Sequence, residues 1–196
     1  MFRFLVTLVA LQSAAALKVS VVGGSGFVGS RVCKYLVECG EEVTSISKSG
    51  AAPEWAAGSE WAGKVNWVAN DLTNGPREGV ASALGSPDAI VSCVGAVGFD
   101  KQQLIVGNGK ANCEIASVAA TLPDLKQIVY VSVSQEVDDS VGWLTGRSAR
   151  IPQWGEGYFI GKRQAEAAYL EAAKGGASTT FIKPSFIYGG DSFGLL

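Results

Sequence analysis

Apolar residues are distributed along the chain in two alternating patterns. Short, nearly continuous apolar runs rich in β-branched residues are typical of strands that are buried on both faces of a sheet. Longer segments with apolar residues three or four positions apart are typical of amphipathic helices. The strand-like runs are residues 18–22, 42–47, 64–69, 88–94, 125–132 and 178–183. The helix-like segments are residues 27–39, 76–84, 101–121 and 158–174.

This alternation predicts an α/β fold. Strands that alternate with helices form right-handed βαβ units, in which helices cover both faces of a parallel sheet. We therefore expect a doubly wound parallel sheet, a Rossmann fold, with about six or seven strands. Residues 49–63 are expected to form a loop with a short helix, and residues 136–157 an irregular loop. Ligands of such sheets bind at the carboxyl ends of the strands, so the residues that follow each strand are the informative ones.

The first 16 residues differ in kind from the rest. Arg3 precedes an apolar run from Phe4 to Leu11, and Gln-Ser-Ala-Ala-Ala follows. This is the pattern of a signal peptide, and it is shorter than the ~20 apolar residues of a membrane span. We expect residues 1–16 to be a cleaved targeting segment for an organelle or the secretory route, and residues 17–196 to be one domain. An uncleaved apolar leader and an organelle presequence are the alternatives.

Composition narrows the classes of function. Hydrophobic residues make up 47% of the chain and charged residues 17%, which describes a folding chain. The net charge of −2 gives no excess of positive charge of the kind that binds nucleic acid. The chain has no histidine, which excludes histidine-based triads and most zinc and haem sites. We interpret the four cysteines as small buried apolar residues rather than as disulfide or metal ligands: Cys33, Cys39, Cys93 and Cys113.

A glycine-rich turn joins the first predicted strand to the first predicted helix. Its spacing is G-x-x-G-x-x-G. The first glycine lets the chain turn, the second lets backbone approach a pyrophosphate, and the third lets the helix pack tightly on the sheet. The helix N-terminus presents amide N–H groups to the phosphates. This context favours a dinucleotide site over a plain turn, with these predicted contacts: Gly23, Gly24, Ser25, Gly26, Phe27, Val28 and Gly29.

The end of the second strand predicts which dinucleotide binds. NAD(H) is usually held there by an acidic residue that accepts hydrogen bonds from the ribose hydroxyls. This chain has Ser47 and Lys48, and no acidic residue from 45 to 49. Because an ammonium and hydroxyls suit a phosphate, we expect NADP(H) in preference to NAD(H). The alternative is that Lys48 is only a solvated loop lysine.

Two further strand ends supply candidate contacts. Asp71 is a candidate acceptor for the adenine amino group, with Leu72 packing beside it. An Asx turn or a helix cap explains Asp71 equally well, because Thr73 follows. Gly95 lets the backbone pass under the cofactor ribose, or it belongs to a plain loop.

Tyr158 and Lys162 lie four residues apart in a predicted helix and so share a face. A lysine ammonium beside a phenol favours the phenolate and lowers the pKa of the tyrosine. Such a tyrosine exchanges a proton with a substrate oxygen while hydride moves at the nicotinamide, and the lysine also binds the nicotinamide ribose. An unrelated surface pair is the alternative. Ser132 and Ser134 are candidates to orient a substrate carbonyl, and Asn108 is a candidate to support Lys162 through its backbone or water.

With these residues, the chain resembles a short-chain dehydrogenase/reductase of the extended or atypical branch. The matching segments are residues 23–29, 71–72, 129–132, 158–166 and 182–189. The last is similar to the family's Arg-Pro-Gly-x-x-Tyr-Gly segment, with Lys183 in place of the arginine and Ser185 in place of the first glycine.

The resemblance implies roles for individual residues. Tyr158 would be the general acid/base and Lys162 its partner, and Ser134 would be the orienting hydroxyl with Ser132 in reserve. Asn108 matches the asparagine at the start of the family's fourth helix, and the resemblance also places Pro184 at the cofactor.

Residues 108–112 and 162–166 are most similar to an organellar subgroup of this family. It includes coenzyme-Q-biosynthesis accessory reductase-like proteins, their plastid relatives and the nucleotide-binding accessory subunit of respiratory complex I. Several members bind NADPH without established turnover. The resemblance therefore suggests a mitochondrion or plastid, and association with an organellar membrane complex.

Three functional hypotheses remain. The first is an NADP(H)-dependent oxidoreductase that transfers hydride between the nicotinamide and a carbonyl or alcohol of a small molecule. The second is a non-catalytic NADPH-binding accessory or assembly protein. The third is an epimerase or dehydratase acting on a sugar nucleotide. Extended members continue into a substrate-binding lobe after the Tyr-Gly segment, and the expected absence of this lobe disfavours the third hypothesis.

Overall fold

The computed structural model describes residues 15–73, 77–134, 153–185, 187–189 and 192–193, and side chains within them except those of residues 153–155 and 192–193. The predicted targeting segment therefore lies almost entirely outside the described residues. Residues 136–152 of the predicted irregular loop also lie outside them.

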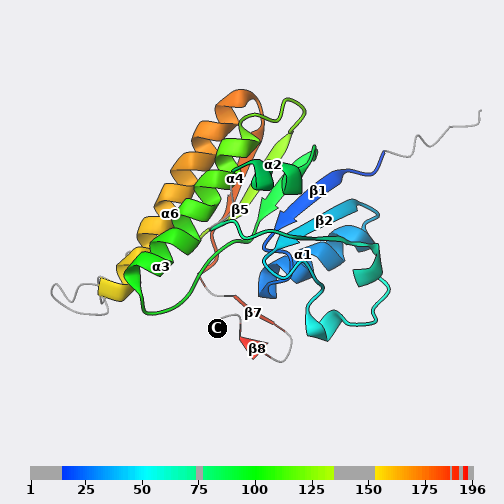
Figure 1. Ribbon diagram of the computed structural model, residues 1–196, viewed down its shortest axis with the longest axis horizontal. Helices are drawn as coiled ribbons and strands as arrows, with labels where there is room; N and C mark the ends of the chain where they lie inside the picture. The colour runs from blue at the N-terminus through cyan, green and yellow to red at the C-terminus, as the bar shows by residue number, and fades with distance from the viewer. Residues whose placement is uncertain (1–14, 74–76, 135–152, 186, 190–191, 194–196) are drawn as a thin grey trace, which may run out of the picture.

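The main sheet has six strands, all parallel, in the order β3-β2-β1-β4-β5-β6 (Figure 1). The doubly wound sheet expected from the alternation of strands and helices is confirmed. The strand order reverses between β1 and β4, which is the place where such sheets bind ligands. The strands are β1 (Lys18–Val22), β2 (Glu42–Ser47), β3 (Asn66–Ala69), β4 (Ala89–Ser92), β5 (Gln127–Val131) and β6 (Ser178–Ile182). A separate antiparallel pair is formed by β7 (Tyr188–Gly189) and β8 (Ser192–Phe193).

Helices cover both faces of the sheet, as expected (Figure 1). One face carries α1 (Phe27–Glu38). This helix ends where predicted, because Gly40 takes a left-handed backbone with φ of 89°. The other face carries α2 (Arg77–Leu84), α3 (Lys101–Ile105), α4 (Ala111–Ala119) and α6 (Gln153–Ala172). Short 3₁₀ turns lie at Glu54–Ala56, Ala62–Lys64 and Ala173–Gly175.

Alternate side chains of the central strands enter two different cores. Val19 and Val21 of β1 pack with Cys33 of α1 and with Trp61 on one face. On the other face, Val22 packs in the larger core, which is built with residues of α2, α4 and α6. The two faces of β1 therefore contribute to two separate cores, one under α1 and the other under α2, α4 and α6. Within the part of the chain that the structure describes, no helix is both long and apolar enough to cross a membrane.

Two helices differ from the sequence prediction. The helix expected at 101–121 is interrupted by a π turn (Val106–Lys110) between α3 and α4, and it ends at Ala119. The helix expected from Tyr158 begins five residues earlier, at Gln153. The prediction places this start too late because Gly157 has a low helix propensity, which its close packing against α3 overrides.

The cysteines also depart from expectation. All four are free thiols, and Cys33 is buried as predicted. Cys39 is exposed, because it caps the C-terminal end of α1 on the surface. Cys93 and Cys113 are partly buried.

Candidate functional site

A cleft of about 410 Å³ lies at the carboxyl ends of β1 to β4, at the point where the strand order reverses. Half of its lining comes from residues predicted to contact a cofactor: Gly23, Ser25, Gly26, Ser47, Lys48, Leu72 and Gly95. The other half was not predicted: Ile46, Ser49, Asn70, Thr73, Cys93, Val94 and Ala111. Most of these residues are close in the sequence to predicted residues, and Ala111 closes the cleft from α4. The apolar spacing of their own segments does not identify them as cleft residues.

The glycine turn is shaped by backbone contacts. Gly23 has a φ of 80°, its N–H donates to the Ile46 carbonyl at 2.8 Å, and its carbonyl accepts from the Gly26 N–H at 3.0 Å. A Cβ on Gly29 would overlap the Gly23 carbonyl oxygen. A Cβ on Gly24 would overlap the Ser45 hydroxyl, so Gly24 serves packing and does not line the cleft.

The turn leaves the start of α1 open to an anion. The N-cap residue Gly26 offers no side-chain cap, and the first turn of α1 has no acidic residue. Unpaired amide N–H groups and the positive end of the helix dipole therefore face the cleft. Phe27, Val28 and Gly29 lie in this first turn and do not line the cleft with their side chains.

Hydroxyl groups gather at the end of β2. The Ser47 and Ser49 hydroxyl oxygens are 3.3 Å apart, and the Ser49 hydroxyl donates to the Ser25 hydroxyl of the glycine turn at 3.5 Å. Lys48 lines the same cleft, and its ammonium pairs with Asp71 on a side chain that is 68% exposed. Lys48 and these serines line one cleft, and their preference for a phosphate stays a prediction.

Asp71 makes the Asx turn that the sequence left as an alternative. Its Oδ1 accepts from the Thr73 N–H at 3.0 Å and from the Thr73 hydroxyl at 2.6 Å. The same oxygen lies 3.4 Å from the Lys48 ammonium. The predicted contact of Asp71 with adenine stays a prediction.

Gly95 joins the cleft to the predicted catalytic pair. A Cβ on Gly95 would lie 3.2 Å from Asn108 Oδ1 and 3.4 Å from Lys162 Nζ. Asn108 is fully buried in the π turn, where its amide accepts from the Ala96 N–H at 3.1 Å and donates to the Ala96 carbonyl at 2.8 Å. The Asn108 side chain therefore fixes the loop after β4, and its support of Lys162 is indirect.

Close helix packing places the pair on α6. A Cβ on Gly161 would lie only 2.7 Å from Asn108 Cβ, and one on Gly157 would overlap the Lys101 carbonyl oxygen. These two glycines bring α6 against α3 and the π turn. As a result, Lys162 is 5% exposed, and its ammonium donates to the Val131 carbonyl at 3.0 Å.

The ionisation of the pair differs from the prediction. Burial lowers the pKa of Lys162 to about 8, although Cys93 and Glu166 act in the opposite direction. Burial raises the pKa of Tyr158. The expected lowering by Lys162 is wrong for this structure, because the ammonium bonds the Val131 carbonyl and lies 5.6 Å from the centroid of the Tyr158 ring.

The two serines after β5 are both buried but differ in their contacts. The Ser132 hydroxyl donates to Glu166 Oε1 at 2.5 Å. Ser134 is held by its backbone N–H, which donates to the Pro184 carbonyl at 3.0 Å. Pro184 is thereby anchored beside the predicted orienting hydroxyl.

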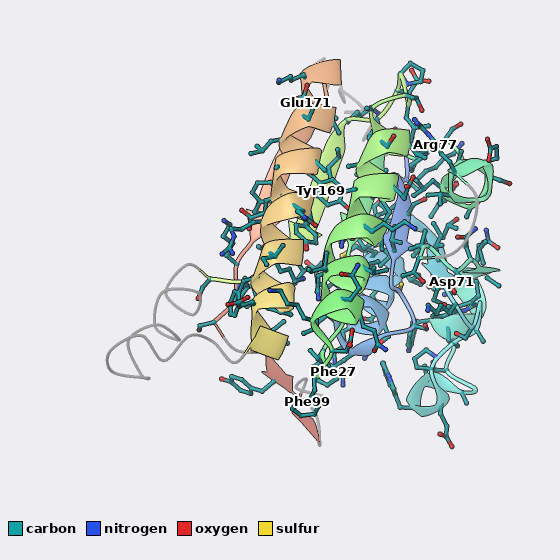
Figure 2. All side chains as sticks on the ribbon, turned by 60° about the vertical axis from the view of Figure 1, so that its left-hand side comes forward. Phe27, Asp71, Arg77, Phe99, Tyr169 and Glu171 are labelled. Carbon is teal, nitrogen blue, oxygen red and sulfur yellow. The ribbon has the colours of Figure 1, made fainter. Side chains whose placement is uncertain are left out.

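A buried polar network behind the site was not predicted. Asn112 Oδ1 accepts from the Ser92 hydroxyl at 2.6 Å and from the Tyr169 hydroxyl at 2.9 Å. Tyr169 points from α6 toward α4 (Figure 2). The network ties the end of β4 to both helices. The spacing of Asn108 and Asn112 on one helical face is the sequence signal that points to it.

Known proteins share the sequence pattern of this chain. Residues 19–193 match the model of the NAD dependent epimerase/dehydratase family. An uncharacterized chloroplastic protein of Arabidopsis thaliana is 33% identical over 174 residues, which are 88% of this chain and 51% of that protein. MIOREX complex component 2 of Saccharomyces cerevisiae is 40% identical over 57 residues, which are 28% of this chain and 21% of that protein.

A solved structure shares the fold. The enzyme WbmF of Bordetella bronchiseptica, in complex with NAD+, matches with a TM-score of 0.65 and 20% identity, covering 89% of this chain and 51% of WbmF. The chain thus spans about half the length of both WbmF and the Arabidopsis relative.

Proposed function

The chain belongs to the NAD dependent epimerase/dehydratase family, and from this premise we propose that its cleft binds a nicotinamide adenine dinucleotide. The observation that carries the proposal is the glycine turn at the reversal of strand order, with an uncapped helix start facing a cleft of about 410 Å³. The solved structure of WbmF, which has the same fold, is a complex with NAD+.

The cleft fits the adenosine half of such a cofactor. Among the described residues, Asn70 Oδ1 is buried without a hydrogen-bond partner, and Asn70 lines the cleft. A buried acceptor without a donor costs free energy, which an amino or hydroxyl group of a ligand would recover. Leu72 supplies apolar surface beside it, and the Gly23 and Gly26 backbone would hold the pyrophosphate.

NADP(H) is the preferred form of the cofactor, and NAD(H) the alternative. The hydroxyls of Ser25, Ser47 and Ser49 and the exposed side chain of Lys48 line the same cleft. Hydroxyl donors and a cation match the charge and the hydrogen-bonding capacity of a 2′-phosphate. Among the described residues, Lys48 pairs with Asp71 through an exposed contact, which a phosphate competes with at small cost.

The reaction that we propose is the reduction of a small-molecule carbonyl. The bound cofactor supplies hydride at the nicotinamide. Because burial raises the pKa of Tyr158, its phenol stays protonated at neutral pH, which suits a proton donor to the carbonyl oxygen. Lys162 would bind the nicotinamide ribose beside Gly95, and Ser134 would hold the carbonyl oxygen.

A non-catalytic accessory or assembly role in an organelle is the second candidate. It is supported by the similarity to MIOREX complex component 2 and by the chloroplastic relative. The full chain would bind NADPH in the same cleft, with residues 1–16 directing it to the organelle.

Titration of the full chain with NADPH and NADH, followed by assay against a panel of carbonyl compounds, distinguishes these functions. Binding with turnover supports the oxidoreductase, and binding without turnover supports the accessory protein. Absence of binding to both dinucleotides contradicts the proposed cleft function, and tighter binding of NADH contradicts the preference for NADP(H).

A further inference from the structure

We propose that Glu166 is a positioning residue of the site, which holds the ends of β5 and β6 in place under Lys162 and acts on Lys162 through its charge. This inference rests on the proposed function for its purpose, and on contacts within the chain for its evidence. Lys162 and Glu166 are four residues apart in the sequence, which puts both on one face of α6.

The Glu166 carboxylate is held on both oxygens. Oε1 accepts from the Ser132 hydroxyl at 2.5 Å, and Oε2 lies 2.8 Å from the Lys183 ammonium. Ser132 follows β5 and Lys183 follows β6, so one side chain of α6 ties together two strand ends that are far apart in the sequence. The Glu166 side chain is 20% exposed and Ser132 is 3% exposed, so the bond between them is less screened than a surface contact, whereas the Lys183 side chain is 37% exposed.

The backbones of Ser132 and Ser134 continue the pairing of β5 with β6 beyond the two strands. The Ser132 hydroxyl is occupied by Glu166, and the Ser132 N–H donates to the Ile182 carbonyl at 2.8 Å. Two residues later, the Ser134 N–H donates to the Pro184 carbonyl at 3.0 Å. Glu166 therefore helps to keep the β5 and β6 ends in register at the level of the site.

Glu166 also acts on Lys162. The ionisable groups that face Lys162 are Tyr158 and Glu166 on α6, Tyr130 on β5 and Cys93 after β4. The carboxylate favours the protonated ammonium, which burial disfavours. Lys183 neutralises part of the Glu166 charge, so it limits this support.

The pH at which the free energy of unfolding begins to rise reports the pKa of Lys162. This measurement needs no cofactor. We would measure denaturant unfolding of the full chain at a series of pH values for the wild type and three variants. Glu166→Gln removes the charge and keeps the shape. Lys183→Met removes the competing cation, and Glu171→Gln removes a carboxylate of the same helix that pairs with Lys174 on the surface.

The expected shifts have opposite signs. The wild-type rise begins near pH 8. Glu166→Gln moves it down by about half a pH unit or more, Lys183→Met moves it up, and Glu171→Gln leaves it unchanged. A merely structural contact would not shift the two variants in opposite directions. If Glu166→Gln does not fold, the upward shift in Lys183→Met still tests the proposal.

An unchanged onset in both Glu166→Gln and Lys183→Met overturns the positioning role. NADPH titration across the same pH range is the second readout, in which Glu166→Gln is expected to lose affinity at a lower pH than the wild type. If the wild type binds no NADPH, the proposed function fails, while the unfolding data still decide the role of Glu166.

Discussion

The Lys48 ammonium lies 3.4 Å from the Asp71 carboxylate, so the ends of β2 and β3 meet across the mouth of the cleft. The sequence pattern treats these residues as two separate cofactor contacts. The structure joins them in one ion pair, whose side chains are 68% and 38% exposed. Because an exposed pair contributes about 0–1 kcal/mol, Lys48 can leave Asp71 for a phosphate at little cost.

We expect Lys48→Ala to weaken NADPH binding about tenfold and to change NADH binding by less than about twofold, since a charge-assisted bond to phosphate is worth about 1.5–3 kcal/mol. Fluorescence titration with each dinucleotide measures both effects. Lys64→Ala is the matched control, because Lys64 is an exposed lysine that pairs with Glu60 at 2.7 Å away from the cleft. Equal losses for NADPH and NADH would contradict the assigned phosphate contact.

Gly29→Ala should disrupt the dinucleotide turn. The new Cβ would overlap the Gly23 carbonyl oxygen, so α1 must move away from the turn. Overpacking of this kind costs about 1–3 kcal/mol of folding stability, and we expect at least a tenfold loss of NADPH affinity. Denaturant unfolding and dinucleotide titration measure the two effects. Gly63→Ala is the control, because nothing lies within 4 Å of its Cβ position; similar behaviour of both variants would rule out the packing argument.

The parts of the fold that depend on local pattern could be predicted from the sequence. Apolar runs and helical spacing predict all six strands of the main sheet, and the glycine turn predicts where the cleft lies. The π turn and the early start of α6 depend on contacts such as Asn108 with Ala96 and Gly157 with Lys101. Those contacts join segments that are far apart in the sequence, so local periodicity carries no information about them.

The residues of the candidate site could be predicted from the sequence, but their pKa shifts could not. Spacing places Tyr158 and Lys162 on one face, but it does not report how deeply the packing of α6 buries them. Burial reverses the expected direction of the pKa of Tyr158. Glu166 was also visible only as a helical neighbour of Lys162, because its partners Ser132 and Lys183 follow two strands that are distant in the sequence.

Tyr158→Phe should separate binding from chemistry. Loss of a positioned general acid reduces turnover by about 10²–10⁴-fold, while NADPH affinity is expected to stay within about twofold of the wild type. Steady-state kinetics with an active carbonyl compound and fluorescence titration measure the two quantities. Tyr35→Phe is the control, because Tyr35 is 67% exposed on α1. Full activity of Tyr158→Phe would show that another group donates the proton.

Lys162 should make folding stability depend on pH in the alkaline range. Burial lowers its pKa from 10.5 to about 8, so between these values the unfolded chain binds more protons than the folded chain. Stability contributed by this group therefore rises from about pH 8 to about pH 10.5 and is constant below and above that window. A pKa shift of this size corresponds to about 3 kcal/mol in the free energy of unfolding.

Lys162→Met should remove the rise, whereas Lys174→Met, which removes an exposed lysine, should retain it. Denaturant unfolding at about pH 7 and about pH 10 measures the difference. Identical pH dependence in the wild type and Lys162→Met would mean that the Lys162 ammonium is not destabilised by its burial.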